Sequence, residues 1–143
     1  MTSDKQEYSI IAKNWLENFL KKKNADKFSI EVIIPRSNIS KLAHPKIKRI
    51  ENYTLFDFKP DVLGLLTSKV NSKVEIVLLN RSVSAVNIKE IGEMNVYCSI
   101  SDPLYSFIVS LKGLPTEVNT LLLNDNIETS LLNYNGEKTI ILL

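Results

Sequence analysis

The sequence predicts a single α/β domain of the α+β type, in which a mixed central β-sheet is flanked by helices. Its 143 residues match the usual size of one domain, about 100–150 residues. Some segments carry apolar residues at helical spacing, and others are short β-branched or wholly apolar runs. The alternation of these two patterns gives the element order α-β-β-β-α-β-α-β over residues 1–143.

The first two elements are a long helix and a strand. Residues 4–22 form an amphipathic helix that Asp4 can cap, and its apolar stripe contains Ile11, Trp15 and Phe19, widened by Leu16 and Leu20. The β-branched run at 28–35 predicts a strand that ends at a proline. Residues 36–52 are basic and irregular, and they predict a surface loop with one short helical turn.

A β-hairpin occupies the centre of the chain. Its strands are predicted at 62–67 and 73–80, joined by a polar turn at 69–72. The second strand is almost wholly apolar, which is typical of a strand covered on both faces.

The remaining elements alternate helices and strands. Asn87 and Glu90 form a capping-box-like start for a helix at 88–100, and a strand is predicted at 105–111. Pro115 suits the first turn of a further helix through residue 123. After a short amphipathic piece at 127–133, an Asn-Gly turn leads to a terminal strand at 138–143.

Composition limits the class of protein. The apolar fraction of 44% and the charged fraction of 24% are typical of globular chains. Cys98 is the only cysteine, so intramolecular disulfides and cysteine-rich zinc sites are excluded. No apolar run approaches the roughly 18 residues that a membrane helix needs, and the start is polar. We therefore expect a cytoplasmic protein with no membrane partner.

The net charge of +2 hides a strong asymmetry along the chain. Residues 1–60 carry 12 Lys and Arg against 7 Asp and Glu, whereas residues 61–143 carry 6 against 9. Basic clusters attract nucleic-acid phosphates, although a solvated lysine-rich face gives the same pattern. If the basic half binds duplex DNA, the candidate contacts are Lys41, Lys46, Lys48, Arg49 and Arg81.

Three further segments carry a family resemblance: Pro60–Gly64 (PDVLG), residues 89–103 (KEIGEMNVYCSISDP) and residues 107–115 (FIVSLKGLP). Together with the element order, they resemble the PD-(D/E)xK nuclease superfamily, which has the restriction-endonuclease-like fold. The resemblance covers nearly the whole chain, and it implies metal-assisted hydrolysis of a phosphodiester. In this family an Asp and a Glu of the hairpin hold Mg²⁺, and a Lys two residues after the Glu helps to activate the water.

The catalytic positions of that family are degraded in this chain. Asp61 matches the aspartate and is the only candidate metal ligand in the hairpin at its expected place. Folding the hairpin about its turn puts Asp61 approximately opposite Leu79, so the positions of the Glu and Lys fall on Leu78 and Asn80. Leucine cannot bind a metal, and a neutral amide cannot replace an ammonium group. Among the other acidic residues, Glu75 lies roughly 10 Å too near the turn, and Glu7 or Glu17 of the first helix is the remaining candidate.

Three hypotheses follow for the function. The first is a degenerate nuclease-like domain that binds nucleic acid without cleavage and needs no cofactor. The second is an active, Mg²⁺-dependent DNA endonuclease with a migrated site, which uses Asp61, Glu75 and a cation such as Lys59, Lys73 or Arg81. The third is an assembly module that acts as a homodimer or within a larger protein complex, because a fold alone does not imply a function.

Overall fold

The structure, a computed structural model, describes residues 2–82, 86–110, 133–135 and 138–143. These residues form a mixed β-sheet with helices, the α+β class that the sequence predicts, with strand order β1-β2-β3-β4-β6-β5. The chain divides into two compact units, Met1–Leu78 and Leu79–Leu143. Strand β3 crosses the boundary between them, and we describe each unit by itself. The prediction of a single domain over 1–143 stays a prediction.

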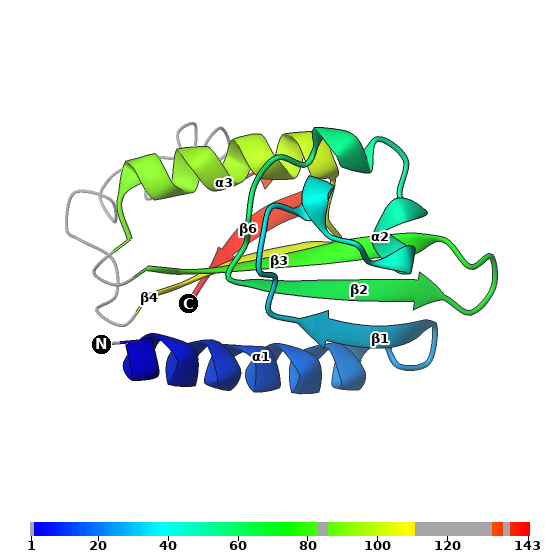
Figure 1. Cartoon of the computed structure of the whole chain (residues 1–143), viewed down its shortest axis with the longest axis horizontal. Helices are drawn as coiled ribbons and strands as arrows, with labels where there is room; N and C mark the ends of the chain where they lie inside the picture. The colour runs from blue at the N-terminus through cyan, green and yellow to red at the C-terminus, as the bar shows by residue number, and fades with distance from the viewer. Residues whose placement is uncertain (1, 83–85, 111–132, 136–137) are drawn as a thin grey trace. The chain divides into compact units, whose positions relative to one another are not determined.

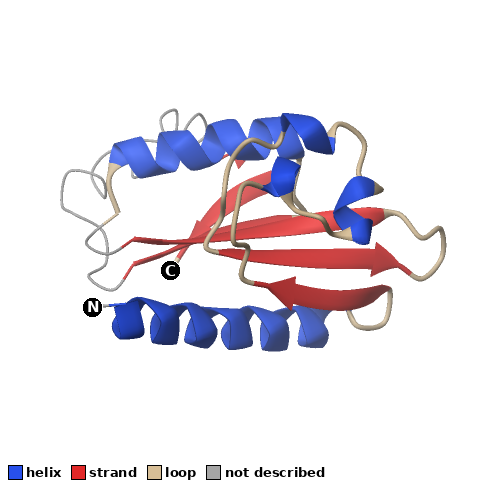
Figure 2. Cartoon of the chain, in the orientation of Figure 1, coloured by secondary structure: helices blue, strands red, loops and turns tan. Residues whose placement is uncertain are grey.

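The first unit begins with one long helix and then forms the first part of the sheet (Figures 1 and 2). Its elements are α1 (Thr2–Asn24), β1 (Phe28–Ile33), the 3-10 turn η1 (Ile39–Lys41), α2 (Pro45–Lys48), the 3-10 turn η2 (Tyr53–Leu55), β2 (Val62–Ser68) and β3 (Val74–Ser82). The predicted strands at 62–67 and 73–80 are therefore confirmed, and the predicted strand at 28–35 ends two residues earlier.

Helix α1 packs along β1 and β2 (Figure 1). Its buried face consists of Ala12, Leu16 and Leu20, whereas Ile11 is 59% exposed and Trp15 is 40% exposed. The predicted apolar stripe is thus wider than the surface that β1 and β2 offer. Its outer edge faces solvent, where the ring of Trp15 stacks on Phe19 with centroids 5.5 Å apart.

Strand β2 is covered on both faces, because each residue from 62 to 66 is buried. It pairs antiparallel with β1, with Val32 opposite Gly64. A Cβ atom built on Gly64 would lie 3.0 Å from Val77 Cβ and 3.2 Å from Leu20 Cδ1. The glycine therefore allows α1 and β3 to come close to this position of β2.

The segment between β1 and β2 contains more regular structure than the sequence predicts. Pro45 opens α2, because the first helical position needs no N–H donor. The ring nitrogen Nδ1 of His44 accepts a hydrogen bond from the Lys46 N–H and so caps α2. The apolar side chains of Ile39, Ile47, Phe56 and Phe58 are buried and anchor the segment to the first unit.

The second unit contains α3 (Ile88–Ser101), β4 (Tyr105–Ser110), β5 (Asn133–Tyr134) and β6 (Lys138–Leu142). Strand β4 pairs parallel with β6, and β5 pairs antiparallel with β6. The predicted cap of α3 is confirmed, since the Asn87 side chain accepts from the Glu90 N–H at 2.8 Å. The predicted helix at 115–123 and all but the last residue of the predicted piece at 127–133 lie outside the described residues, and the short β5 is an element that the sequence did not predict.

No helix in the described part of the chain combines the length and apolar character needed to cross a bilayer.

Candidate nucleic-acid interface

The β2–β3 hairpin closes with the predicted four-residue turn. Ser68 N–H donates to the Lys73 carbonyl at 2.8 Å, and the Ser68 hydroxyl oxygen accepts from the N–H groups of Val70 and Asn71. Ser72 adopts a left-handed conformation with φ 63°, which completes the reversal.

The residues at the predicted motif positions of β3 have different environments. Leu78 is fully buried in the first unit, and Asn80, in the second unit, is half-buried. Glu75 lies two residues after the turn-closing Lys73, and its carboxylate is 3.8 Å from the Lys73 ammonium. The structure thus joins Glu75 to a surface lysine, and the assignment of Leu78 and Asn80 to the degraded motif stays a prediction.

Asp61 lies immediately before β2 and lines a cavity of about 470 Å³ in the first unit. The other lining residues are Ser9 and Ile10 of α1, residues 34–36 and Lys59. Two cationic side chains, Arg36 and Lys59, therefore share the cavity with one carboxylate. The sequence suggested Lys59 as a possible cation near Asp61, but it gave no reason to place Arg36 there.

Glu7 and Glu17, the predicted candidate metal ligands of the first helix, both lie in α1. The carboxylate of Glu17 accepts a hydrogen bond from the Lys21 ammonium at 3.0 Å, and this hydrogen bond lowers the pKa of Glu17. Glu7 lies in the same helix, near its beginning. Within the described part of the chain, no group of three or more His, Cys, Asp or Glu side chains is arranged to hold a metal ion.

Basic residues from three distant segments meet at the turn of the hairpin. The Arg49 guanidinium donates to the Ser72 carbonyl, and Lys69 donates its N–H to the Lys27 carbonyl at 3.0 Å. The Lys69 ammonium also donates to the Ala25 carbonyl at 2.8 Å. We name Lys27, Arg49, Lys69 and Lys73 the turn cluster; all four are exposed.

The charge of the turn cluster is only partly balanced. Its contacts to Ser72, Lys27 and Ala25 are with neutral carbonyl groups, which hold the cations in place without cancelling their charge. Glu75 lies near Lys73, and the exposed Asp26 lies beside Lys27 in the chain. The last turn of α1 adds Lys21, Lys22 and Lys23 a few residues before Lys27. The sequence suggested Arg49 as a candidate DNA contact, but it gave no reason to place Lys27, Lys69 and Lys73 near it.

The other residues that the sequence predicts to contact DNA differ in their exposure and in whether their charge is paired. Lys41 and Lys48 are exposed, but the Lys46 ammonium lies 3.1 Å from Glu31 Oε1. His44 Nε2 is 2.7 Å from the second oxygen of Glu31, so Lys46 belongs to a neutralised group. Arg81 is half-buried in the second unit, at the end of β3.

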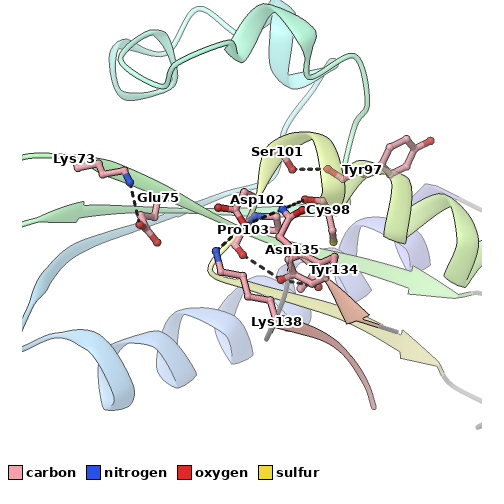
Figure 3. A network of polar contacts seen from close by, with 11 residues as sticks. Lys73, Glu75, Tyr97, Cys98, Ser101, Asp102, Pro103, Tyr134, Asn135 and Lys138 are labelled. Atoms are coloured by element: carbon pink, nitrogen blue, oxygen red, sulfur yellow. Dashed lines mark hydrogen bonds and ion pairs between the residues drawn. The ribbon is translucent and has the colours of Figure 1, made fainter. Parts of the chain in front are cut away.

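A polar network in the second unit fastens Asn135, which follows β5, and Lys138, which begins β6, to the C-terminal end of α3 (Figure 3). The Asp102 carboxylate accepts from Asn135 at 3.0 Å and from Lys138 at 2.8 Å. The Tyr134 hydroxyl donates to the Pro103 carbonyl at 3.1 Å, and burial raises the pKa of Tyr134 to about 12. Burial also raises the pKa of Cys98 to about 11. Each polar contact named here joins two parts of the second unit.

The geometry defines an α+β protein with an exposed basic cluster and a charged cavity in its first unit. No family model, no curated protein and no solved structure matches the chain.

Proposed function

We propose that this chain is a nuclease-like domain that binds the phosphate backbone of duplex DNA without cleaving it. The turn cluster carries the proposal, because it collects exposed cations from residues 27, 49, 69 and 73 on one end of the first unit. Phosphate contacts from Lys and Arg supply most of non-specific DNA affinity. The resemblance of the sequence to PD-(D/E)xK nucleases supports nucleic acid as the partner.

Two features support binding without catalysis. Leu78 is apolar and fully buried at the position that the resemblance assigns to the second metal-binding carboxylate. Asp61 shares its cavity with Arg36 and Lys59, and two cations beside one carboxylate disfavour a divalent metal ion by electrostatic repulsion. We therefore propose a domain without a resident cofactor, and a cytoplasmic location is part of the proposal because its one cysteine is a free thiol.

One observation favours the assembly module as a second candidate. Ile11 and Trp15 expose an apolar strip on the outer face of α1, and such strips commonly mark protein contacts. This candidate predicts binding to a protein surface and no affinity for DNA.

Salt-dependent binding to a duplex oligonucleotide tests the proposal. Lys73→Gln should reduce the slope of log K against log salt concentration by about 0.9, and Lys27→Gln with Lys73→Gln by about 1.8, because each phosphate contact releases about one counterion. Fluorescence anisotropy over a range of salt concentrations measures both slopes.

Lys89→Gln is the matched control. Lys89 is 84% exposed and lies 4.0 Å from Glu93, much as Lys73 is 71% exposed and lies 3.8 Å from Glu75. This variant should bind DNA with the wild-type slope. The proposal is wrong if the wild-type chain shows no affinity for DNA at low salt, or if Lys89→Gln and Lys73→Gln weaken binding equally.

A further inference from the structure

The cavity at the start of β2 has three kinds of wall. Arg36 and Lys59 supply positive charge, Asp61 supplies a hydrogen-bond acceptor, and Ile10 and Ile34 supply apolar surface, 52% and 39% exposed. Pro35 and Ser9 complete the lining. The volume of about 470 Å³ is within the range of small-molecule sites, roughly 300–1,000 Å³.

The backbone holds these walls in place. Strands β1 and β2 pair up to Ile33 opposite Leu63, just before the cavity residues. Beyond the cavity, Ile39 N–H donates to the Phe58 carbonyl at 3.0 Å, and the Asn38 side chain donates to Asp57 at 2.6 Å. The two segments that carry Arg36 and Lys59 are therefore fastened on both sides of the cavity.

The charges select the chemistry of the ligand. Two cations and one carboxylate leave an excess of one positive charge, which favours an anion. A carboxylate in the same cavity disfavours a bare anion such as inorganic phosphate, and it favours a ligand that also carries a hydroxyl or amine donor. The side chains of Ile10 and Ile34 favour a flat or apolar body next to the anionic group.

We infer that this cavity binds one nucleotide through its terminal phosphate monoester. The phosphate lies between Arg36 and Lys59, a sugar hydroxyl or base amine donates to Asp61, and the base packs on Ile10 and Ile34. A monoester carries about −1.5 to −2 charges at pH 7 and three acceptor oxygens, so it can accept from both Arg36 and Lys59, while the hydroxyl or amine that donates to Asp61 offsets the carboxylate. The nucleotide is either free or the phosphorylated end of a strand, and in the second case the inference extends the proposed DNA binding.

Titration with adenosine monophosphate, inorganic phosphate and adenosine tests the chemistry. Calorimetry at low salt should show the nucleotide binding at least about tenfold more tightly than either fragment. Arg36→Gln should weaken nucleotide binding by about tenfold, since it removes one charge-assisted phosphate contact. Lys89→Gln, outside both the cavity and the turn cluster, should leave it unchanged, and thermal unfolding confirms that each variant is folded.

A second pair of ligands identifies the source of the nucleotide. Duplexes with a 5′-phosphate and with a 5′-hydroxyl are compared on wild type and on Arg36→Gln. A preference for the phosphorylated end that Arg36→Gln abolishes assigns the cavity to strand ends, whereas binding of adenosine monophosphate alone assigns it to free nucleotides.

The inference is overturned if the chain neither binds adenosine monophosphate nor prefers the phosphorylated end, or if Arg36→Gln changes neither measurement. This failure is distinct from failure of the proposed function, because the effect of Lys73→Gln on DNA binding does not depend on the cavity.

Discussion

Glu31 shows how one side chain removes charge from the basic segment of the first unit. Its Oε2 lies 2.7 Å from His44 Nε2, and its Oε1 lies 3.1 Å from the Lys46 ammonium. Because His44 Nδ1 accepts from the Lys46 N–H, the ring proton lies on Nε2 and is donated to Glu31. One carboxylate thus orients the residue that caps α2 and neutralises a cation that the sequence assigned to DNA.

Glu31 should make folding stability depend on pH. The hydrogen bond from His44, followed by that from Lys46, lowers the pKa of Glu31 below 4.5. A depressed pKa in the folded state stabilises the fold fully above pH 4.5 and loses this effect as the pH falls through the folded value. Because the carboxylate is 37% exposed, screening limits the effect to about 0.5–1 kcal/mol.

Denaturant unfolding of Glu31→Gln at pH 7 and at pH 3 measures this contribution. The variant should be less stable than wild type at pH 7, and the difference should shrink at pH 3. Glu51→Gln, at an exposed position after α2, is the control and should behave as wild type at both pH values. A difference that grows as the pH falls would show that Glu31 does not act through its charge.

At the scale of elements, the packing of α1 on β2 depends on one glycine. A methyl group on Gly64 would meet Val77 Cβ at 3.0 Å and Leu20 Cδ1 at 3.2 Å; Val77 Cβ is bonded to the backbone of β3 and moves only with it, whereas Leu20 Cδ1 has to give by a few tenths of an ångström. Gly92 in α3 provides the opposite case, since a Cβ there meets no described atom within 4 Å. Close packing therefore limits the side chain at Gly64, whereas at Gly92 the glycine affects only the conformational freedom of the backbone.

Substitution by alanine should therefore change the free energy of unfolding in opposite directions at Gly64 and at Gly92. Gly64→Ala should lower the free energy of unfolding by about 1–3 kcal/mol through overpacking. Gly92→Ala should raise it by about 0.4–1 kcal/mol, because alanine reduces the entropy of the unfolded chain and suits a helix interior. Urea denaturation of both variants tests the pair, and a neutral Gly64→Ala would contradict the close packing of α1 against β2.

At the scale of the whole molecule, the charges around Asp61 lead us to expect no nuclease activity. The purified chain should not nick supercoiled plasmid DNA with Mg²⁺ or Mn²⁺, because Asp61 is accompanied by Arg36 and Lys59 in its cavity. The assay follows conversion of supercoiled to open-circular DNA over time. Metal-dependent nicking that Asp61→Ala abolishes would instead establish the migrated-site enzyme, with Glu75 or a helix glutamate as the next ligand to test.

The sequence by itself determined the class and most of the elements. Helical spacing at 4–22 and 88–100 and the apolar runs of the hairpin are local patterns, and the helices and strands in the described residues follow them closely. Asn87 as a cap and Asp61 before a strand are equally local. The sequence did not determine which side of the apolar stripe on α1 is buried. Leu16 and Trp15 are both apolar, and only the contact of α1 with β1 and β2 decides that Leu16 is buried and Trp15 is exposed.

The tertiary structure decided which distant charges meet. Lys27, Arg49, Lys69 and Lys73 are separated by up to 46 positions, and the hairpin turn brings them together through its hydrogen bonds to the α1–β1 loop and to Arg49. The same is true of Arg36 and Asp61, which share a cavity because β1 and β2 are antiparallel neighbours. A lysine pattern shows the amount of charge in a segment, but the neighbours of each lysine in the fold, such as Glu31 of β1 for Lys46 of α2, decide whether that charge is available to a ligand.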